Sequence, residues 1–193
     1  MPRVKLFNED EVLHKAMDLF WEKGYFDTSV GDMVDRLGIN RGSMYTTFGN
    51  KKSMFDQSLS LYCKINEDAT LKFLESQKSV KEGIKNVFER FIDTSVNDIN
   101  HKGCLVVNTT TEIGSSDKDV EKILLKHKKK IEDIFYQFLL KGQESGEISM
   151  EKDIKAISFL IYTLFNGIRV VSKLEKNSQN LLATLNTVLS LLD

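Results

Sequence analysis

The sequence predicts an all-α protein made of a small N-terminal head, residues 1–53, and a larger helical domain, residues 54–193. Three observations support this prediction. The only proline is Pro2, so the strongest helix breaker is absent from the rest of the chain. Apolar residues recur at intervals of three and four through most of the sequence. Glycines and good N-cap residues stand where these periodic segments stop and start.

The first predicted helix covers residues 8–23, where apolar side chains form a wide stripe at helical spacing. Asn8 stands at the N-cap position and Glu11 follows three residues later, which is the pattern of a capping box. Gly24 comes directly after the stripe and ends the helix, because glycine readily adopts the conformations that close helices.

Two shorter helices follow. Thr28 and Ser29 can cap the second helix, which ends at Gly38, and Asn40 caps a third helix that reaches about Thr46. Two short helices joined by a glycine turn and buttressed by a longer first helix form a helix-turn-helix unit. The second helix of such a pair is the one that enters the DNA major groove.

Local charge favours the same segment, although the net charge of −1 for the whole chain does not indicate a nucleic-acid binder. Residues 36–55 contain four basic side chains and no acid, whereas residues 9–35 are rich in acids. An arginine, small residues and hydroxyls on one helix suit base edges and phosphates. The residues expected at DNA are Thr28, Ser29, Asn40, Arg41, Gly42, Ser43, Tyr45, Thr46, Thr47 and Lys51. The alternative is that this helix is only a polar surface turn.

Six further helices are predicted after the head. They cover residues 50–76, 80–96, 104–113, 120–140, 154–174 and 181–192. The segment 104–113 is rich in β-branched residues and by itself favours a strand. A lone strand among helices would have no partner for pairing, so we expect a helix there as well.

Composition limits the functional class. Hydrophobic residues make up 41% of the chain and charged residues 28%, as in soluble globular proteins. Cys63 and Cys104 lie far apart without a CxxC pair, which argues against a disulfide framework or a zinc site and favours a reducing cytoplasm. We find no secretory signal and no stretch that approaches the roughly 18 apolar residues of a membrane span. A cytoplasmic protein without a membrane partner is therefore expected.

No motif indicates catalysis. The three histidines are scattered, and neither an HExxH motif, a paired-carboxylate spacing nor a phosphate-cradling glycine loop is present. We expect no enzyme activity, no cofactor and no metal, with an all-α enzyme whose site is dispersed as the less favoured alternative. The basic run 126–130 is expected to be the solvated face of an amphipathic helix rather than a second nucleic-acid patch.

The head resembles the TetR family of bacterial transcriptional repressors. The residues that carry this resemblance are Ala16, Leu19, Phe20, Gly24-Tyr25, Thr28-Ser29, Met33-Val34, Gly38-Ile39, Gly42-Ser43, Met44-Tyr45, Phe48 and Lys51. Val34 departs from the alanine that the family favours, so the angle between the two short helices is expected to differ slightly. A weaker similarity, to the C-terminal domain of an AcrR-like subgroup, rests on Gly103-Cys104-Leu105, Asn108, Glu112, Gly146-Glu147 and Gly167-Ile168-Arg169-Val170.

The resemblance implies an all-α homodimer that binds double-stranded operator DNA and is released by a small molecule. It also implies that Thr28, Tyr45 and Lys51 contact the DNA backbone. Arg41, Ser43 and Thr47 are then better placed for base edges. A DNA-binding protein that senses no ligand is the alternative within the same class.

Residues 156–171 are apolar nearly all round, which indicates a helix buried on more than one side. Packing this helix and the last one against their copies would make an isologous four-helix interface. The expected interface residues are Ile161, Ile168, Leu181, Leu182, Leu185, Val188, Leu189 and Leu192. A single thick core in a monomer is the alternative.

An effector pocket is expected where aromatic side chains meet a few polar groups in the larger domain. The expected residues are Tyr62, Phe88, Phe91, Cys104, Asn108, Phe159, Tyr162, Phe165 and Asn166. Few charges fall among them, so the ligand is expected to be uncharged and apolar, or electrophilic if Cys104 is a reactive thiol. The competing interpretation is a plain aromatic core with an inert buried cysteine.

Overall fold

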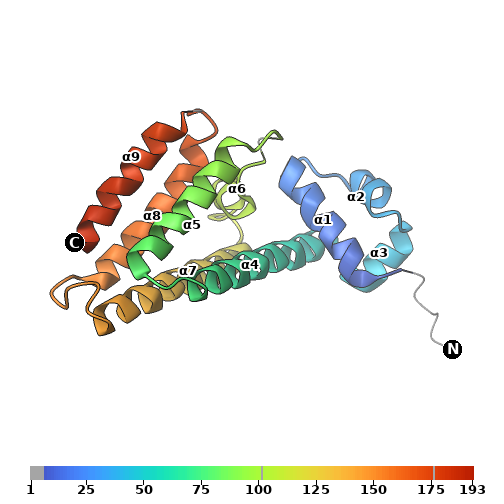
Figure 1. The fold of residues 1–193 in the computed structure, drawn as a ribbon. Coiled ribbons are helices and arrows are strands. Elements are labelled where there is room, and N and C mark those ends of the chain that lie inside the picture. The colour runs from blue at the N-terminus through green and yellow to red at the C-terminus, as the bar shows by residue number, and fades with distance from the viewer. Residues whose placement is uncertain (1–6, 101, 176) are drawn as a thin grey trace. The chain divides into compact units, whose positions relative to one another are not determined.

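The computed structural model describes residues 7–100, 102–175 and 177–193. Within these ranges the chain forms nine α-helices and one short 3-10 helix, and no strand (Figure 1). The α-helices are α1 Glu9–Lys23, α2 Val30–Leu37, α3 Arg41–Phe48, α4 Lys51–Glu75, α5 Val80–Val96, α6 Leu105–Glu112, α7 Lys118–Glu144, α8 Ile154–Val171 and α9 Ser178–Leu189. The all-α prediction is therefore confirmed, including a helix at the β-branched segment 104–113.

The N-caps predicted at Asn8, Ser29 and Asn40 are present in the structure, whereas the capping box expected at Asn8 shows only the bonds that Asn8 accepts. The Asn8 side chain accepts hydrogen bonds from the first turn of α1, and Ser29 forms a complete capping box with Asp32 at the start of α2. Gly24 and Gly38 follow α1 and α2 with φ angles of 81° and 68°, a region that side chains with a Cβ rarely adopt. Because each helix has a defined start and stop, three helices fit into fewer than fifty residues.

The chain divides into two compact units. Unit 1 takes in the chain through Ile65 together with Cys104–Leu124, and unit 2 takes in Asn66–Gly103 and Leu125–Asp193. Two of the three divisions fall inside helices, at 65/66 in α4 and at 124/125 in α7, and the third, at 103/104, falls just before α6. These units are defined by packing, and the boundary between a DNA-binding and an effector domain at residues 53/54 stays a prediction.

Unit 1 has one hydrophobic core that joins α1–α3 to the start of α4, to α6 and to the start of α7. Phe20 and Phe55 meet edge to face in it, with ring centroids 5.0 Å apart. Cys104, Leu105 and Val106 are buried in the same core. The head is thus wider than three helices, because α6 supplies part of its apolar packing.

Unit 2 is built around α5, α8 and α9, which run side by side (Figure 1). The N-terminus of α5 is held by the carboxylate of Glu147, which accepts hydrogen bonds from the amides of Val80 at 2.7 Å and Lys81 at 2.9 Å. Burial alone raises the pKa of Glu147, but these bonds and one from Ser79 outweigh it and hold the pKa below its usual value. A distant loop therefore fixes where α5 begins.

α8 is long and apolar enough to cross a membrane by length and composition, and only 33% of its residues are buried in this chain. This corrects the expectation that no stretch approaches that length. Core helices of soluble proteins have the same composition, so one such helix is weak support for a membrane span.

Candidate nucleic-acid interface

α3 is anchored on one side and open on the other. Asn40 caps it, with its side-chain oxygen 2.8 Å from the amide nitrogen of Ser43. Met44 and Phe48 are buried in the core of unit 1. Because these two side chains fix the helix, its remaining side is free to meet another molecule without disturbing the fold.

The open side of α3 has the predicted chemistry. Arg41, Gly42, Tyr45 and Thr46 are exposed, and Ser43 and Thr47 are half-buried beside them. The guanidinium of Arg41 lies over the ring of Tyr45, with 5.8 Å between its central carbon and the ring centroid. The hydroxyl of Thr46 donates to the carbonyl of Gly42 at 2.8 Å.

Gly42 is not required by the packing of the protein itself. A Cβ at this position would meet only the side-chain oxygen of Asn40, at an ordinary 3.4 Å. Glycine inside a helix costs about 1 kcal/mol relative to alanine, so its presence needs another reason. Close approach of a DNA backbone or base edge to α3 supplies one.

Two of the four basic side chains in residues 36–55 are neutralised by ion pairs in the structure. Arg36 is paired with Glu22, and the ammonium of Lys52 lies 2.7 Å from Asp56 and 3.1 Å from Asp117. Among the described residues, Arg41 and Lys51 have no carboxylate within ion-pair distance. The positive surface is therefore narrower than the sequence count suggests, and it is centred on α3 and the start of α4.

Lys51 also has a structural role. Its ammonium lies 4.5 Å from the centroid of the Tyr25 ring and 3.4 Å from the carbonyl oxygen of Phe26. The adjacent Asn50 caps α4, accepting from the amide of Ser53 at 2.9 Å. Lys51 thus holds a positive charge at a helix N-terminus, where phosphate oxygens bind well.

Thr28 is the exception among the expected DNA contacts. Its side chain is fully buried, and its hydroxyl donates to the carbonyl of Gly24 at 2.6 Å. A side chain in that position closes the loop between α1 and α2, so the expectation that it touches DNA is wrong for the protein in this conformation. Ser29 next to it is exposed and caps α2.

Glu112 is a residue of this region that the interface prediction missed. Its two carboxylate oxygens accept hydrogen bonds from the amides of Tyr25, at 3.1 Å, and Phe26, at 2.8 Å. The last residue of α6 thereby holds the loop that precedes α2, and it lies against Gly24, where a Cβ would come within 3.0 Å of the carboxylate. The weak resemblance around position 112 was the only signal for it in the sequence.

The expected effector residues fall into several groups. Tyr62 and Cys104 are buried in the core of unit 1, where Asn108 is half-buried on α6. In unit 2, the ring of Phe165 contacts the rings of both Phe88 and Phe91. The other three residues also lie on α8. Phe159 is exposed, Tyr162 is half-buried, and the side-chain amide of Asn166 donates to the carbonyl of Tyr162. The effector pocket expected from the sequence therefore stays a prediction.

The expected interface residues mostly face the interior of their own chain. Ile161, Ile168, Leu181, Leu185, Val188 and Leu192 are buried in the core of unit 2, and Leu182 and Leu189 are half-buried against it. This corrects the assignment for the six buried residues, because a side chain buried inside unit 2 offers no surface to a second chain. Leu182 and Leu189 stay predicted interface residues. The exposed apolar residues of α8 and its end are Phe159, Leu160, Val170, Val171 and Leu174.

The basic run at 126–130 contains a buried histidine that the sequence did not reveal. His127 is 4% exposed, and its Nδ1 atom lies 2.7 Å from a carboxylate oxygen of Glu67 on α4. Lys126, Lys129 and Lys130 are exposed, as expected for a solvated face. Burial, reinforced by the charge of Arg169, lowers the pKa of His127 below its usual 6.5, although the bond to Glu67 opposes this.

Known proteins match the chain along its whole length. Two family profiles match: "Bacterial regulatory proteins, tetR family" over residues 12–57, and "Tetracyclin repressor-like, C-terminal domain" over residues 81–188. The uncharacterized HTH-type transcriptional regulator YezE of Bacillus subtilis (strain 168) is 30% identical over 100% of both chains. The HTH-type transcriptional repressor ComR of Escherichia coli (strain K12) is 28% identical, over 98% of this chain and 90% of that protein.

A solved structure shares the fold. It is a cysteine mutant of the regulator CifR complexed with a 26-base-pair operator DNA, and it matches this chain with a TM-score of 0.84. The match covers 97% of this chain and 98% of the other at 24% sequence identity.

Proposed function

This chain belongs to the tetR family of bacterial regulatory proteins and is a DNA-binding transcriptional repressor rather than an enzyme, and on that basis we propose how it works. It binds a palindromic operator as a homodimer, with α3 of each chain in a major groove. A small molecule bound in unit 2 releases the operator. The protein acts in the cytoplasm, where bacterial DNA lies.

The observation that carries the proposal is the open side of α3. It presents Arg41, which has no carboxylate partner among the described residues, beside a glycine that the protein does not itself require. An arginine fork at a groove edge recognises guanine through two parallel hydrogen bonds. Ser43 and Thr47, on the half-buried edge of the helix, are the second candidates for base edges, while Tyr45 and Lys51 are suited to phosphates.

The homodimer is supported by the exposed face of α8. Leu160, Thr163, Gly167 and Val171 are exposed and spaced three and four apart, so they form one stripe along the helix. A Cβ at Gly167 would meet nothing within 4 Å, which leaves open space on this stripe. A second α8 related by two-fold symmetry would cover the stripe and bring two backbones close at the glycine.

Release follows if the ligand binds one state of the dimer more tightly than the other. α4 is one continuous helix that is separated from α3 by two residues and reaches Glu75 in unit 2. A ligand that shifts α4 would change the spacing of the two α3 helices and take them out of register with successive major grooves. Moving the population from 1:99 to 99:1 requires about 5.5 kcal/mol of differential affinity.

An electrophilic ligand is not favoured by the position of Cys104. Its side chain is 2% exposed and belongs to the core of unit 1. A thiol buried in apolar surroundings reacts slowly. The rate of alkylation of the wild type and of Cys104→Ser, measured with operator release, tests this: fast modification at Cys104 that releases DNA would restore the sensor-thiol interpretation.

Selection from random duplex DNA tests the operator proposal. The wild type is expected to enrich a palindrome whose half-sites lie about one helical turn apart. The matched comparison is the variant Arg41→Ala, which should keep the fold because Arg41 is exposed. This variant is expected to enrich a more degenerate half-site. If the wild type enriches nothing, the protein does not read DNA sequence and the proposal fails.

A further inference from the structure

Unit 2 contains a cavity of about 150 Å³ between α4, α5 and α8, which we call the arginine cavity. Its aromatic wall is the stacked pair Phe91 and Phe165, with ring centroids 3.9 Å apart and planes inclined by 20°. The guanidinium of Arg169 lies over both rings, 4.6 Å and 4.9 Å from their centroids. A flat apolar surface and a flat cation therefore meet at one place.

The charge of this cavity is one-sided. Arg90 and Arg169 line it, and no acidic residue does. Arg90 is exposed, lies over the ring of Phe73 on α4, and has no carboxylate within ion-pair distance among the described residues. Glu67 on α4, next to the lining residue Asn66, has its carboxylate bound to His127 at 2.7 Å. Two guanidinium groups in a partly apolar setting attract an anion, and their fork shape suits a carboxylate.

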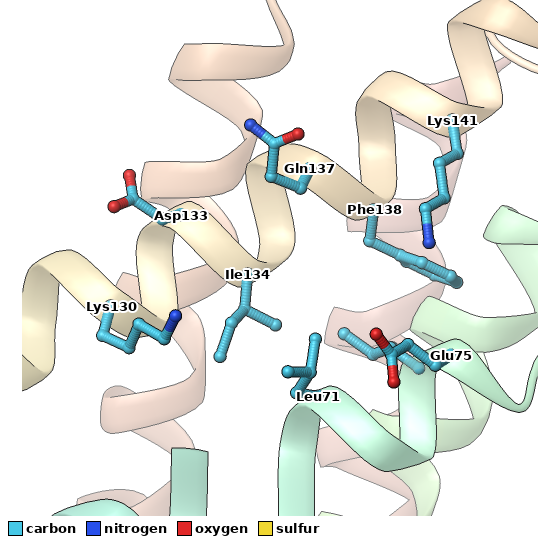
Figure 2. Close-up of a pocket in the computed structure, with 9 residues that line it drawn as sticks. Leu71, Glu75, Lys130, Asp133, Ile134, Gln137, Phe138 and Lys141 are labelled. Atoms are coloured by element: carbon cyan, nitrogen blue, oxygen red, sulfur yellow. The ribbon is translucent and has the colours of Figure 1, made fainter. Parts of the chain in front are cut away.

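A second cavity of unit 2 lacks this bias. It measures about 140 Å³ and lies between α4 and α7, where Leu71 and Ile134 point toward one another (Figure 2). Its rim carries two acids and two lysines: Glu75, Asp133, Lys130 and Lys141. Opposite charges balance there, so the second cavity favours no sign of ligand charge. Of these two cavities, the arginine cavity is the one whose lining suits a charged molecule.

We propose that the arginine cavity binds a small aromatic carboxylate and that this class of molecule is the effector. A cavity of about 150 Å³ is large enough for one benzene ring. The ring would lie against Phe91 and Phe165, and the carboxylate would reach the guanidinium groups of Arg90 and Arg169. The role as effector rests on the proposed function, whereas the binding itself does not. The proposal replaces the uncharged ligand expected from the sequence, which overlooked both arginines.

The position of the cavity connects binding to release. One of its walls is α4, which contributes Thr70 and Phe73, and another is α5, which contributes Arg90. A ligand held by α5 and α8 while it contacts α4 would favour one placement of α4 over others. That differential contact is what a release mechanism requires.

Calorimetric titration of the full-length protein with benzoate tests the binding. The wild type is expected to bind benzoate with a Kd of about 1 mM or lower, an affinity that a ligand with as few non-hydrogen atoms as benzoate can reach. Benzyl alcohol, which has the same ring without the charge, should bind at least about tenfold more weakly, the loss expected for one charge-assisted hydrogen bond. Arg169→Gln and Arg90→Gln should each weaken benzoate binding by a similar factor.

Lys85→Gln is the matched control, because it removes one positive charge from the exposed side of α5 outside the cavity. Its affinity for benzoate should equal that of the wild type. Arg90 is exposed, so Arg90→Gln keeps the test valid even if Arg169→Gln unfolds, which a thermal melt would reveal. No binding of benzoate by the wild type, or equal binding by Arg90→Gln and the wild type, would overturn the site.

A second arm examines the effector role with the selected operator. Benzoate should weaken operator binding by the wild type and leave operator binding by Arg90→Gln unchanged. Benzoate that binds the protein but does not change operator affinity would overturn the effector role. Failure of the wild type to bind any DNA sequence would refute the proposed function instead, and it would leave the calorimetric result standing.

Discussion

At the scale of the residue, Arg41 separates base reading from general attraction to DNA. Arg41→Ala should cost about 1–3 kcal/mol on the selected operator, because a bidentate contact to guanine is lost, and less on unrelated duplexes. Salt-titrated binding to the operator and to a scrambled duplex measures the difference. Arg36→Ala is the matched control: it removes an arginine whose charge Glu22 already balances.

Equal losses on both duplexes would assign Arg41 to the phosphates and contradict its role in reading bases. The salt slope distinguishes the two cases, since each lost phosphate contact reduces the slope by about one unit. Arg36→Ala should leave both the affinity ratio and the slope near their wild-type values.

His127 is expected to make stability depend on pH. Its pKa in the folded protein lies below the usual 6.5, because burial disfavours the charged ring. A group with a lowered pKa in the folded state contributes its full stability above about pH 6.5 and loses it as the pH falls through the folded value. The wild type should therefore lose more Tm between pH 7.5 and 5.5 than His127→Gln, in which nothing titrates at this position.

The glutamine in that variant retains an amide that can donate to Glu67, so packing changes little. His14→Gln is the control, because His14 is exposed on α1, and it should keep the slope of the wild type. Identical slopes for the wild type and His127→Gln would show that His127 titrates alike in the folded and unfolded chains.

At the scale of the element, the hydrogen bonds from the amides of Tyr25 and Phe26 to the carboxylate of Glu112 position the loop before α2. Glu112→Gln removes the charge and places an NH2 group where a second acceptor stood, so one of the two backbone amides loses its partner. The free energy of unfolding should fall by about 1–3 kcal/mol. Urea unfolding measures it, with Glu121→Gln, an exposed site at the start of α7, as a control expected within about 0.5 kcal/mol of the wild type.

A loss for Glu112→Gln no larger than that of the control would mean that the two hydrogen bonds add nothing to stability. The loop would then be held by its own packing, with Thr28 and Gly24 sufficient for its shape.

The helices were predictable because their signals are local. N-caps such as Asn8, Ser29 and Asn40 lie within one turn of what they cap, and apolar spacing reports the buried face of each helix. The errors come from long-range contacts. Periodicity shows that α9 has an apolar face, but whether its leucines meet their own chain or a partner depends on the placement of α5. His127 was missed for the same reason, since its partner lies 60 residues away.

The site was predictable to the same degree. The residues of α3 expected at DNA are exposed or half-buried, and Met44 and Phe48 of the same helix are buried. The long-range ion pairs were not predictable, because Arg36 pairs with Glu22 on α1 and Lys52 with Asp117 just before α7. The contact of Lys52 with Asp56, four residues along the same helix, is a local one. Burial of Thr28 was likewise hidden, since a threonine that closes a loop and one that contacts phosphate have the same sequence environment.

At the scale of the whole molecule, the exposed stripe on α8 predicts the oligomeric state. The double variant Leu160→Glu, Val171→Glu would place two charges in the apolar contact between the two α8 helices. Because burying unpaired charges is costly, this variant should be a monomer. Sedimentation equilibrium should give twice the chain mass of 22.1 kDa for the wild type and a single mass for the double variant. Gln137→Glu adds a charge on an exposed site of α7 and should remain dimeric.

A double variant that stays dimeric would place the interface elsewhere, and a monomeric wild type would remove the basis for two heads on one operator. The operator affinity of the double variant should fall together with its mass, because a single α3 contacts only one half-site.

The measurement that tests the central claim most directly compares the selected palindrome with a duplex that carries about five extra base pairs between the half-sites, half a helical turn. If two α3 helices on one dimer read successive major grooves, the insertion turns one half-site to the opposite face of the DNA. Affinity should then fall at least about 100-fold, toward that for a single half-site. Unchanged affinity for the lengthened duplex would contradict the claim that the two α3 helices of one dimer bind successive major grooves.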